Sequence, residues 1–453
     1  MTRWLLLSAW SVCLIWGISP LCAQEKPNIV FILADDLGHG DTGPYGVPDA
    51  KTPRLDQLAA EGVKFTQCYS MGPECTPSRT SILTGRYPQR VGGMECAIGT
   101  GNVGRYDDAI ALAGRRELGL PPRLAVLAPA LKAAGYVNAV FGKWHLGYEP
   151  KFHPLDQGFD AFTGFLGGNV EYFRHVEQSD LPVYLQGREP VTREGYLTHL
   201  ITDDAVAFLN ERAREPGKPF FLYLPHASPH FPFQAPGDDL GRLPTKEEWN
   251  TGTRQSYVAM LEDLDAAVGA VLDALEKNGQ AGRTLVIFAS DNGAQLPGRN
   301  APWRDYKGTL YEGGIRVPCL VRWPGTIEPG TVSHQVGTLM DLTTSLVRVA
   351  GAAVPDGKPL DGIDILQRVV DGAPEIPRTL YWRYRREAVT WWAARDGHLK
   401  LIRRADGDRV EEWLYDLAAD PGETKSLTGT RPGDYARLQR ALLLWEREMV
   451  PMR

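Results

Sequence analysis

The sequence is poor in cysteine, has no excess of basic residues and contains no long apolar run beyond its first residues. Its 453 residues include 49 Lys and Arg against 55 Asp and Glu. This balance argues against nucleic acid as the main partner, because phosphate binding needs a clustered basic surface. No Asn-x-Ser/Thr acceptor occurs, so N-glycosylation is not expected. Internal repeats and low-complexity tracts are also missing, which excludes a solenoid or a disordered chain.

Residues 1–23 have the pattern of a cleaved signal peptide. Arg3 supplies a positive start, residues 5–18 form an apolar run, and a small-residue cleavage site follows. The run is short for a membrane span and no later stretch replaces it, so no membrane span is predicted. Cys22 raises a lipoprotein alternative, but Leu21 before it is a poor residue for lipidation. We expect an exported protein in a periplasmic, secreted or lysosome-like compartment; loss of Arg3 changes its net charge from −6 to −7.

Four cysteines remain after this segment: Cys68, Cys75, Cys96 and Cys319. If Cys75 is reserved for chemistry, the other three allow at most one disulfide and leave one thiol free. The sequence does not decide which of them would pair. A disulfide scaffold is therefore excluded.

Strands alternating with helices predict an α/β fold, a large, mostly parallel sheet sandwiched by helices. Five helices are predicted in this fold: one that starts at Thr52-Pro53, two over 75–84 and 125–134, and two whose apolar faces include 201–209 and 257–275. The expected strands are 28–33, 63–69, 136–141, 220–224 and 284–288. Residues 97–121 are rich in Gly and Arg with little periodicity, and we predict a long surface loop near the functional site.

The pattern changes near residue 362. Four short strand-like runs, 378–385, 388–395, 398–402 and 413–417, are separated by Gly and Asp turns, and a final amphipathic helix follows. These features predict a smaller domain with an antiparallel sheet and a terminal helix. The expected division is a signal peptide at 1–23, a catalytic domain at 24–361 and a C-terminal α+β subdomain at 362–453.

Polar clusters follow four of the predicted parallel strands. They are Asp35/Asp36, Lys143/His145, His226/His230 and Asp291/Asn292. In parallel sheets, ligands bind beyond the carboxyl ends of the strands, so these clusters are expected to meet at one edge. The carboxylate and amide oxygens suit a hard divalent cation, Ca²⁺ or Mg²⁺. Each Asp pair taken alone is as well explained as a turn after a strand.

Cys75 starts the short helical pattern Cys-Thr-Pro-Ser-Arg, which Gly85 ends. A cysteine at a helix N-terminus meets free N–H groups and a positive dipole end, so its thiolate is expected to be favoured. The same geometry attracts an anion such as sulfate or phosphate. Arg79, one turn later, is expected to add a second anion-binding group. By itself the motif is also compatible with a small buried Cys and a solvated Arg.

The full pattern C-x-P-S-R followed by four residues and T-G resembles the signature of the type I sulfatases, in the alkaline phosphatase-like superfamily. In that family the cysteine is oxidised to formylglycine by a formylglycine-generating enzyme, which reads the positions of Cys75, Pro77 and Arg79. Residues 135–147 resemble the second sulfatase signature, with Asn138 where Thr is usual. His230 in His-Phe-Pro and Lys307 match two more family positions, and His226 is the weaker candidate of the two nearby histidines.

The resemblance implies a metal site and a division of catalytic roles. The metal, Ca²⁺ in the family, would be held by Asp35, Asp36, Asp291, Asn292 and the oxidised Cys75. Hydrated formylglycine would attack sulfur, and His230, assisted by Lys307, would protonate the departing oxygen. His145 would then deprotonate the second hydroxyl and release sulfate, while Arg79 and Lys143 hold the sulfate and the hydrate.

Substrate identity is indicated only by a segment at 167–175. It is similar to one in sulfatases that act on sulfated N-acetylgalactosamine, and it proposes Tyr172 and His175 as substrate contacts; an aromatic loop packed on the sheet explains it equally well. The expected substrate is a sulfated carbohydrate or an aryl sulfate. Two alternatives stay open: a phosphonate or phosphate ester hydrolase on the same scaffold, and an unconverted module that binds sulfated glycans.

Overall fold

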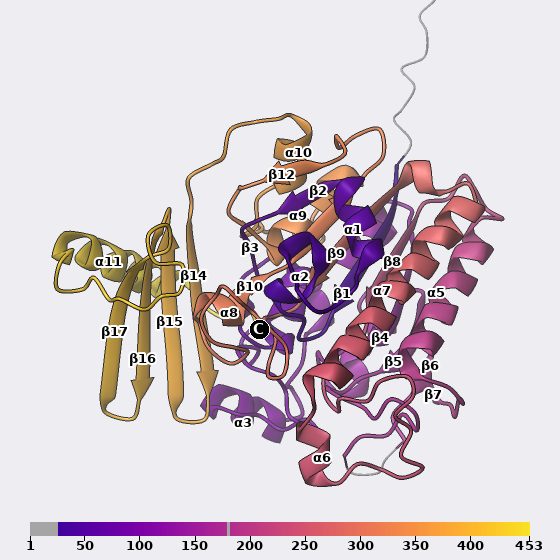
Figure 1. Ribbon diagram of the computed structural model, residues 1–453, viewed down its shortest axis with the longest axis horizontal. Helices are drawn as coiled ribbons and strands as arrows, with labels where there is room; N and C mark the ends of the chain where they lie inside the picture. The colour runs from indigo at the N-terminus through magenta and orange to yellow at the C-terminus, as the bar shows by residue number, and fades with distance from the viewer. Residues whose placement is uncertain (1–25, 179–181) are drawn as a thin grey trace, which may run out of the picture.

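The computed structural model describes residues 26–178 and 182–453 (Figure 1). The predicted signal peptide, residues 1–23, lies outside the described residues. Within the described part, no helix is long and apolar enough to cross a bilayer. The four described cysteines are buried free thiols.

The main sheet has ten strands in the order β12-β2-β11-β9-β1-β8-β4-β5-β6-β7. Its centre is parallel, since β9, β1, β8, β4 and β5 all run in one direction. The bounds of these central strands are Thr284–Ser290, Asn28–Ala34, Phe220–Pro225, Val137–Lys143 and Ala161–Phe165. Antiparallel pairs extend the sheet on both sides, through β11 (Cys319–Arg322) with β2 (Val63–Phe65) on one side and through β6 (Leu185–Gln186) with β7 (Glu189–Pro190) on the other. The edge strand β12 (Thr331–Ser333) pairs with β2 in parallel. The predicted fold class is confirmed.

Helices cover both faces of this sheet because its central strands are apolar on both sides. Along β1, Ile29, Phe31 and Leu33 pack into one core, and Val30, Ile32 and Ala34 pack into the other. The first core is covered by α2 (Cys75–Thr84), α4 (Leu127–Ala133) and α9 (Leu339–Val349). The second is covered by α1 (Pro53–Ala60), α5 (Leu197–Arg212) and α7 (Arg254–Lys277).

The single strand expected at 63–69 is divided between two sheets. Residues 63–65 form β2 of the main sheet, whereas β3 (Cys68–Tyr69) lies between β10 (Arg316–Val317) and β13 (Gly337–Thr338) in a sheet of three strands. The break falls at Thr66 and Gln67, whose side chains donate hydrogen bonds to the backbone carbonyls of Ser333 and His334. This change of sheet directs the chain toward Cys75.

The predicted loop at 97–121 contains a helix, α3 (Asp107–Gly114). Two acidic residues in its first turn favour the helix N-terminus, and good helix formers follow. Only Ala109 of this helix is buried, and Ile110 is 56% exposed. A helix that packs so little lacks the apolar periodicity by which it would be predicted.

A C-terminal antiparallel sheet stands beside the main body, as predicted, with α11 (Pro432–Glu448) packed on it (Figure 1). Its strands follow one another in space as in sequence: β14 (Thr379–Arg386), β15 (Val389–Asp396), β16 (Leu399–Asp406) and β17 (Arg409–Asp416). The last two run further than the predicted 398–402 and 413–417. Their charged outer halves pair as a hairpin that projects from the core, so an apolar pattern could not show them. The remaining short helices are α6 (Lys246–Asn250), α8 (Glu312–Ile315) and α10 (Ile365–Val370).

One buried cation ties this sheet to the main body. Lys400 Nζ on β16 lies 2.8 Å from Glu312 Oε1 and 3.0 Å from Glu423 Oε1, and all three side chains are fully buried. Burial and the Glu312 carboxylate hold the pKa of Glu423 at about 7, even with Lys400 beside it. Because Glu312 starts α8, directly after the loop that carries Lys307, this contact also supports one wall of the site.

Replacing Lys400 with methionine is expected to lower the free energy of unfolding by about 3–5 kcal/mol, since two buried carboxylates lose their shared cation. Without that cation both carboxyl pKa values rise, so the folded state binds more protons than the unfolded state above the ordinary Glu pKa of 4.5. Stability of the variant should therefore fall as pH rises. Urea unfolding at mildly acidic and mildly alkaline pH measures both effects. Lys425→Met, which removes an exposed lysine nearby, is the matched control; an equal loss in both variants, or none, would contradict the assignment.

Candidate active site

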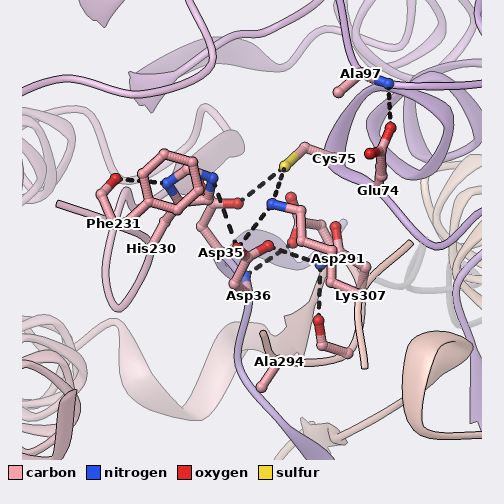
Figure 2. A network of polar contacts seen from close by, with 12 residues as sticks. Asp35, Asp36, Glu74, Cys75, Ala97, His230, Phe231, Asp291, Ala294 and Lys307 are labelled. Carbon is pink, nitrogen blue, oxygen red and sulfur yellow. Dashed lines mark hydrogen bonds and ion pairs between the residues drawn. The ribbon is translucent and has the colours of Figure 1, made fainter. Parts of the chain in front are cut away.

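A cavity of about 330 Å³ opens at the carboxyl edge of the parallel strands. Its wall contains Cys75, His145, His230 and Lys307, which come from four separate segments of the chain. The predicted convergence of polar clusters at one sheet edge therefore occurs in the structure. Figure 2 shows the carboxylates of Asp35 and Asp36 directed toward Cys75 and Lys307.

Cys75 is the first residue of α2, at the bottom of this cavity. Its Sγ lies 3.3 Å from Asp35 Oδ1, 3.2 Å from Lys143 Nζ and 3.7 Å from Lys307 Nζ. Burial and the Asp35 carboxylate raise the thiol pKa well above its usual range, in spite of the two ammonium groups. The expectation of a favoured thiolate is therefore wrong: desolvation outweighs the helix dipole. An unconverted Cys75 is a neutral thiol and a poor nucleophile.

The position of Cys75 is held by the residue before it. Glu74 Oε2 accepts the Ala97 N–H at 2.7 Å, and its other oxygen pairs with Arg386 from β14. The helix ends at Gly85, which has the left-handed conformation (φ 65°) and donates to the Ser81 carbonyl. All ten residues of α2 are buried. The first turn is thus fixed between the main body and the C-terminal sheet.

The acidic and amide side chains predicted to bind a metal lie together. Asp35 and Asp36 follow β1, and Asp291 and Asn292 follow the adjacent β9. Asn292 Nδ2 donates to Asp36 Oδ1 at 2.7 Å, and the Asp36 N–H donates to Asp291 Oδ1 at 3.3 Å. Ligand atoms of Asp35, Asp36, Cys75 and His230 lie within 4.8 Å of one another. His230 was not among the predicted ligands, whereas Asp291, which was, is outside this group and accepts hydrogen bonds from Arg79.

Two features of this cluster fit a hard divalent cation. Asn292 Oδ1 is buried and accepts no hydrogen bond from the described residues. In addition, the Asp35, Asp36, Asp291 and Asn292 side chains offer oxygen atoms, which Ca²⁺ and Mg²⁺ prefer as ligands. The carboxyl groups differ in acidity: burial favours protonation of Asp36, but Lys307, His230 and Lys143 hold its pKa at about 2. Burial and the Asp35 carboxylate raise the pKa of Asp291 to about 6.

Arg79 lies behind the carboxylates and does not line the cavity, although it was predicted to hold the substrate anion. Its Nε and Nη2 donate to Asp291 Oδ2 at 3.1 and 2.9 Å, and Nη1 donates to the Lys143 carbonyl at 2.8 Å. The side chain is fully buried. Lys143 is equally buried and pairs with Asp35 beside the Cys75 sulfur. Three cations, Arg79, Lys143 and Lys307, therefore balance the three carboxylates.

A backbone hydrogen bond determines which ring nitrogen of His145 carries the proton. Its Nε2 lies 2.8 Å from the Ile98 carbonyl, which can only accept, so Nε2 carries the proton. Nδ1 is buried without a hydrogen-bond partner among the described residues. Burial and the Lys143 cation lower the pKa of His145 well below its usual range. The ring is therefore neutral, with a lone pair available to accept a proton.

His230 has the opposite orientation. Its Nδ1 donates to the Phe231 carbonyl at 2.7 Å, so Nε2 faces the carboxylate group, 3.6 Å from Asp36 Oδ2. Burial and the Lys307 cation lower its pKa well below the usual range. His226, the weaker candidate, does not line the cavity; both of its nitrogens are buried without partners in the described part, and burial lowers its pKa to about 3.

Tyr172 and His175, predicted as substrate contacts, do not line the cavity. The Tyr172 hydroxyl donates to the His230 carbonyl at 3.0 Å, and its ring stacks on Tyr196. His175 Nε2 is bonded to the Gly195 carbonyl at 3.1 Å. Tyr172 thus supports the segment that carries His230, and its neighbours Gly168 and Asn169 reach the wall instead.

Several wall residues were not found from the sequence. They are Thr100, Arg105, Asn169, Asn250, Gln295 and Arg386. Asn169 lies in the 167–175 segment, where Tyr172 and His175 were predicted instead, and Arg386 comes from the C-terminal sheet. The available signals were the predicted placement of the 97–121 segment near the site, which includes Thr100 and Arg105, and the 167–175 segment, which includes Asn169.

Comparisons with known proteins identify the family of this chain. A family model described as Sulfatase matches residues 27–352, and one described as N-sulphoglucosamine sulphohydrolase, C-terminal, matches 301–446. The N-acetylgalactosamine-6-sulfatase of Canis lupus familiaris is 36% identical over 84% of this chain and 73% of its own length. Arylsulfatase A of Homo sapiens is 34% identical over 93% of this chain and 87% of its own length. The crystal structure of Ps i-CgsB in complex with k-i-k-neocarrahexaose superposes with a TM-score of 0.81 at 29% identity, covering 93% of each chain.

Proposed function

The chain belongs to the sulfatase family, and we propose that it hydrolyses sulfate monoesters of carbohydrates by means of a formylglycine made from Cys75. The contacts of Cys75 carry this proposal. A buried, neutral thiol that touches one carboxylate and two ammonium groups at the bottom of a cavity is badly placed for thiol chemistry. The same carbon, carrying oxygen, would lie among groups that stabilise negative charge. A formylglycine-generating enzyme is the proposed maturation partner, and export is proposed from the pattern of residues 1–23.

The proposed metal is Ca²⁺, held by Asp35, Asp36, Asp291, Asn292 and the converted residue 75. When bound, such a cation offsets negative charge at sulfur and on the attacking oxygen. The three carboxylates already balance Arg79, Lys143 and Lys307. A divalent cation would therefore give the site a net positive charge for a sulfate ester anion. In this proposal Arg79 fixes the carboxylates and Lys143 contacts residue 75.

The histidines are proposed to divide the proton transfers. Conversion of Cys75 would give an aldehyde, and addition of water to it would supply two hydroxyl groups on one carbon, one to attack sulfur and one whose deprotonation releases sulfate. His145 suits the second task, because its Nδ1 is unprotonated and its side chain belongs to the wall of the same cavity. His230 Nε2 faces Asp36 Oδ2, the oxygen that also pairs with Lys307. A bound ester anion would raise the pKa of His230 and allow Nε2 to carry a proton for the departing alkoxide.

A sulfated sugar is the proposed substrate class. The relatives include enzymes named for N-acetylgalactosamine 6-sulfate, and one structural neighbour was solved with an oligosaccharide. A cavity of about 330 Å³ with mixed polar walls has the size of a small-ligand pocket.

The test is sulfate release from nitrophenyl sulfate and from sulfated disaccharides by protein coexpressed with a formylglycine-generating enzyme. Removal of divalent cations by a chelator should abolish release, and Ca²⁺ should restore it and raise the melting temperature. At a concentration of about 100 times Kd, the ion would stabilise the protein by about 2.7 kcal/mol. Asp36→Asn should weaken both effects of Ca²⁺, because it removes one charged ligand.

Two comparisons make this experiment decisive. Asp371→Asn, which neutralises an exposed carboxylate remote from the cavity, should respond to Ca²⁺ like the parent protein. Faster hydrolysis of nitrophenyl phosphate or phenylphosphonate esters than of the sulfate would favour the phosphoester alternative. Tight glycan binding with no hydrolysis of any ester would favour the binding module.

A further inference from the structure

A second, larger cavity adjoins the first. It measures about 970 Å³ and lies between the 99–110 segment and the hairpin of β14 and β15. Thr100 and Arg105 line both cavities, so the two meet at these side chains. The hairpin and the segment are tied together, since the Glu387 N–H donates to the Arg105 carbonyl and Arg385 pairs with Asp108 of α3. The cleft thus has room for more than the group that loses sulfate.

Arg105 is the cation at this junction, and it has no anionic partner among the described residues. Its Nε is buried without a hydrogen-bond acceptor in that part of the chain. The other cations of the two cavity walls are engaged: Lys307 with Asp36, Arg386 with Glu74, and Arg385 with both Glu95 and Asp108. Asp107 and Glu387 also line the outer cavity, but neither makes an ion pair with Arg105.

The backbone holds Arg105 in place at the junction. Gly99 and Val103 pair across a tight loop just before it. A Cβ at Gly104 would lie 2.3 Å from the Ala109 backbone, so the segment approaches α3 as closely as glycine allows. The buried Nε–H of Arg105 has lost its hydration without gaining a hydrogen-bond acceptor from the described residues, which is unfavourable. An oxygen atom of a bound ligand would supply the missing acceptor.

We propose that Arg105 is a specificity residue, which binds a second anionic group of the substrate while the sulfate to be removed lies at Cys75. The fork of a guanidinium fits a carboxylate or a sulfate with two parallel hydrogen bonds. Because Arg105 joins the inner cavity to the outer one, this anion belongs to the sugar next to the one that loses sulfate. The preferred substrate is thus an acidic sulfated glycan with at least two anionic groups. This inference rests on the proposed sulfatase function.

Three disaccharides that share one sulfated sugar test this inference. Their second sugar is neutral, a uronic acid, or sulfated. For the parent protein, kcat/KM should be about 10- to 100-fold higher when the second sugar is a uronic acid, is sulfated, or in both cases, than when it is neutral. This is the effect expected for a charged hydrogen-bonded pair. Arg105→Gln should remove most of this preference, chiefly through KM, because the contact is the same in ground and transition states. The comparison of uronic acid with sulfate identifies which anion binds.

Arg115→Gln is the matched control, since it removes an equal charge from an exposed arginine of the same segment that lines neither cavity. It should keep the preference. If the parent protein releases sulfate but Arg105→Gln keeps the same preference among the disaccharides, this inference is overturned. The proposed sulfatase function would not be affected by that result. Failure of the parent protein to release sulfate from nitrophenyl sulfate and from every disaccharide would overturn the proposed function itself, and this inference with it.

Discussion

Replacing Cys75 with alanine is expected to abolish sulfate release, with kcat falling by roughly 10⁴-fold or more, as when other enzymes lose their nucleophile. The reason is geometric: no other described hydroxyl or thiol touches Asp35, Lys143 and Lys307 together. Release of inorganic sulfate and of nitrophenol measures the loss. In the parent protein, the mass of the peptide around Cys75 should show conversion of the thiol to an aldehyde.

The Cys75→Ser variant tests whether the reaction needs the proposed aldehyde or only a nucleophilic side chain at position 75. A serine oxygen could attack sulfur once, but it lacks the second hydroxyl whose deprotonation releases sulfate, so at most one turnover is expected. Cys96→Ala removes another buried thiol that does not line the cavity, and turnover should persist. Full multiple-turnover activity in Cys75→Ser would rule out the aldehyde mechanism.

His230→Ala is expected to slow the release of sulfate from a glycan by roughly 10²–10⁴-fold, the usual contribution of general acid catalysis to a poor leaving group. Nitrophenolate is stable enough to depart with little help, so hydrolysis of nitrophenyl sulfate should fall much less. The ratio of kcat/KM for the two substrates is the measurement. His226→Phe alters a buried ring outside the cavity wall, and any loss that it causes should be equal for both substrates.

His145→Ala should not discriminate between leaving groups, because His145 acts after the leaving group has departed. Loss of its unpartnered Nδ1 removes the base that releases sulfate from residue 75. A burst of nitrophenol followed by stalling is the expected time course, with sulfate retained on the enzyme. Equal losses on both substrates for His230→Ala, together with no burst for His145→Ala, would show that the two roles are wrongly assigned.

The sequence by itself determined the fold class and the location of the chemistry. Continuous apolar runs such as 28–33 and amphipathic helices such as 257–275 are local patterns, and they are sufficient to predict a parallel sheet between helix layers. Parallel strands end at one edge, so the groups that follow them must meet there. The carboxylates of Asp35 and Asp36 could therefore be placed at this edge before any coordinates were known, and Cys75 was assigned to the site by its resemblance to the sulfatase signature.

Tertiary structure alone decided the state and the exact task of each group. A pKa depends on burial and on neighbours that are remote in sequence, so the neutral thiol of Cys75 contradicts the local helix-dipole argument. Arg79 turns toward Asp291, 212 residues away, instead of toward the cavity, because a buried guanidinium must pair with buried carboxylates. The histidine tautomers depend on carbonyls of Ile98 and Phe231. Arg386 reaches the cleft only because the C-terminal sheet packs against it, and no periodicity in the chain encodes that contact.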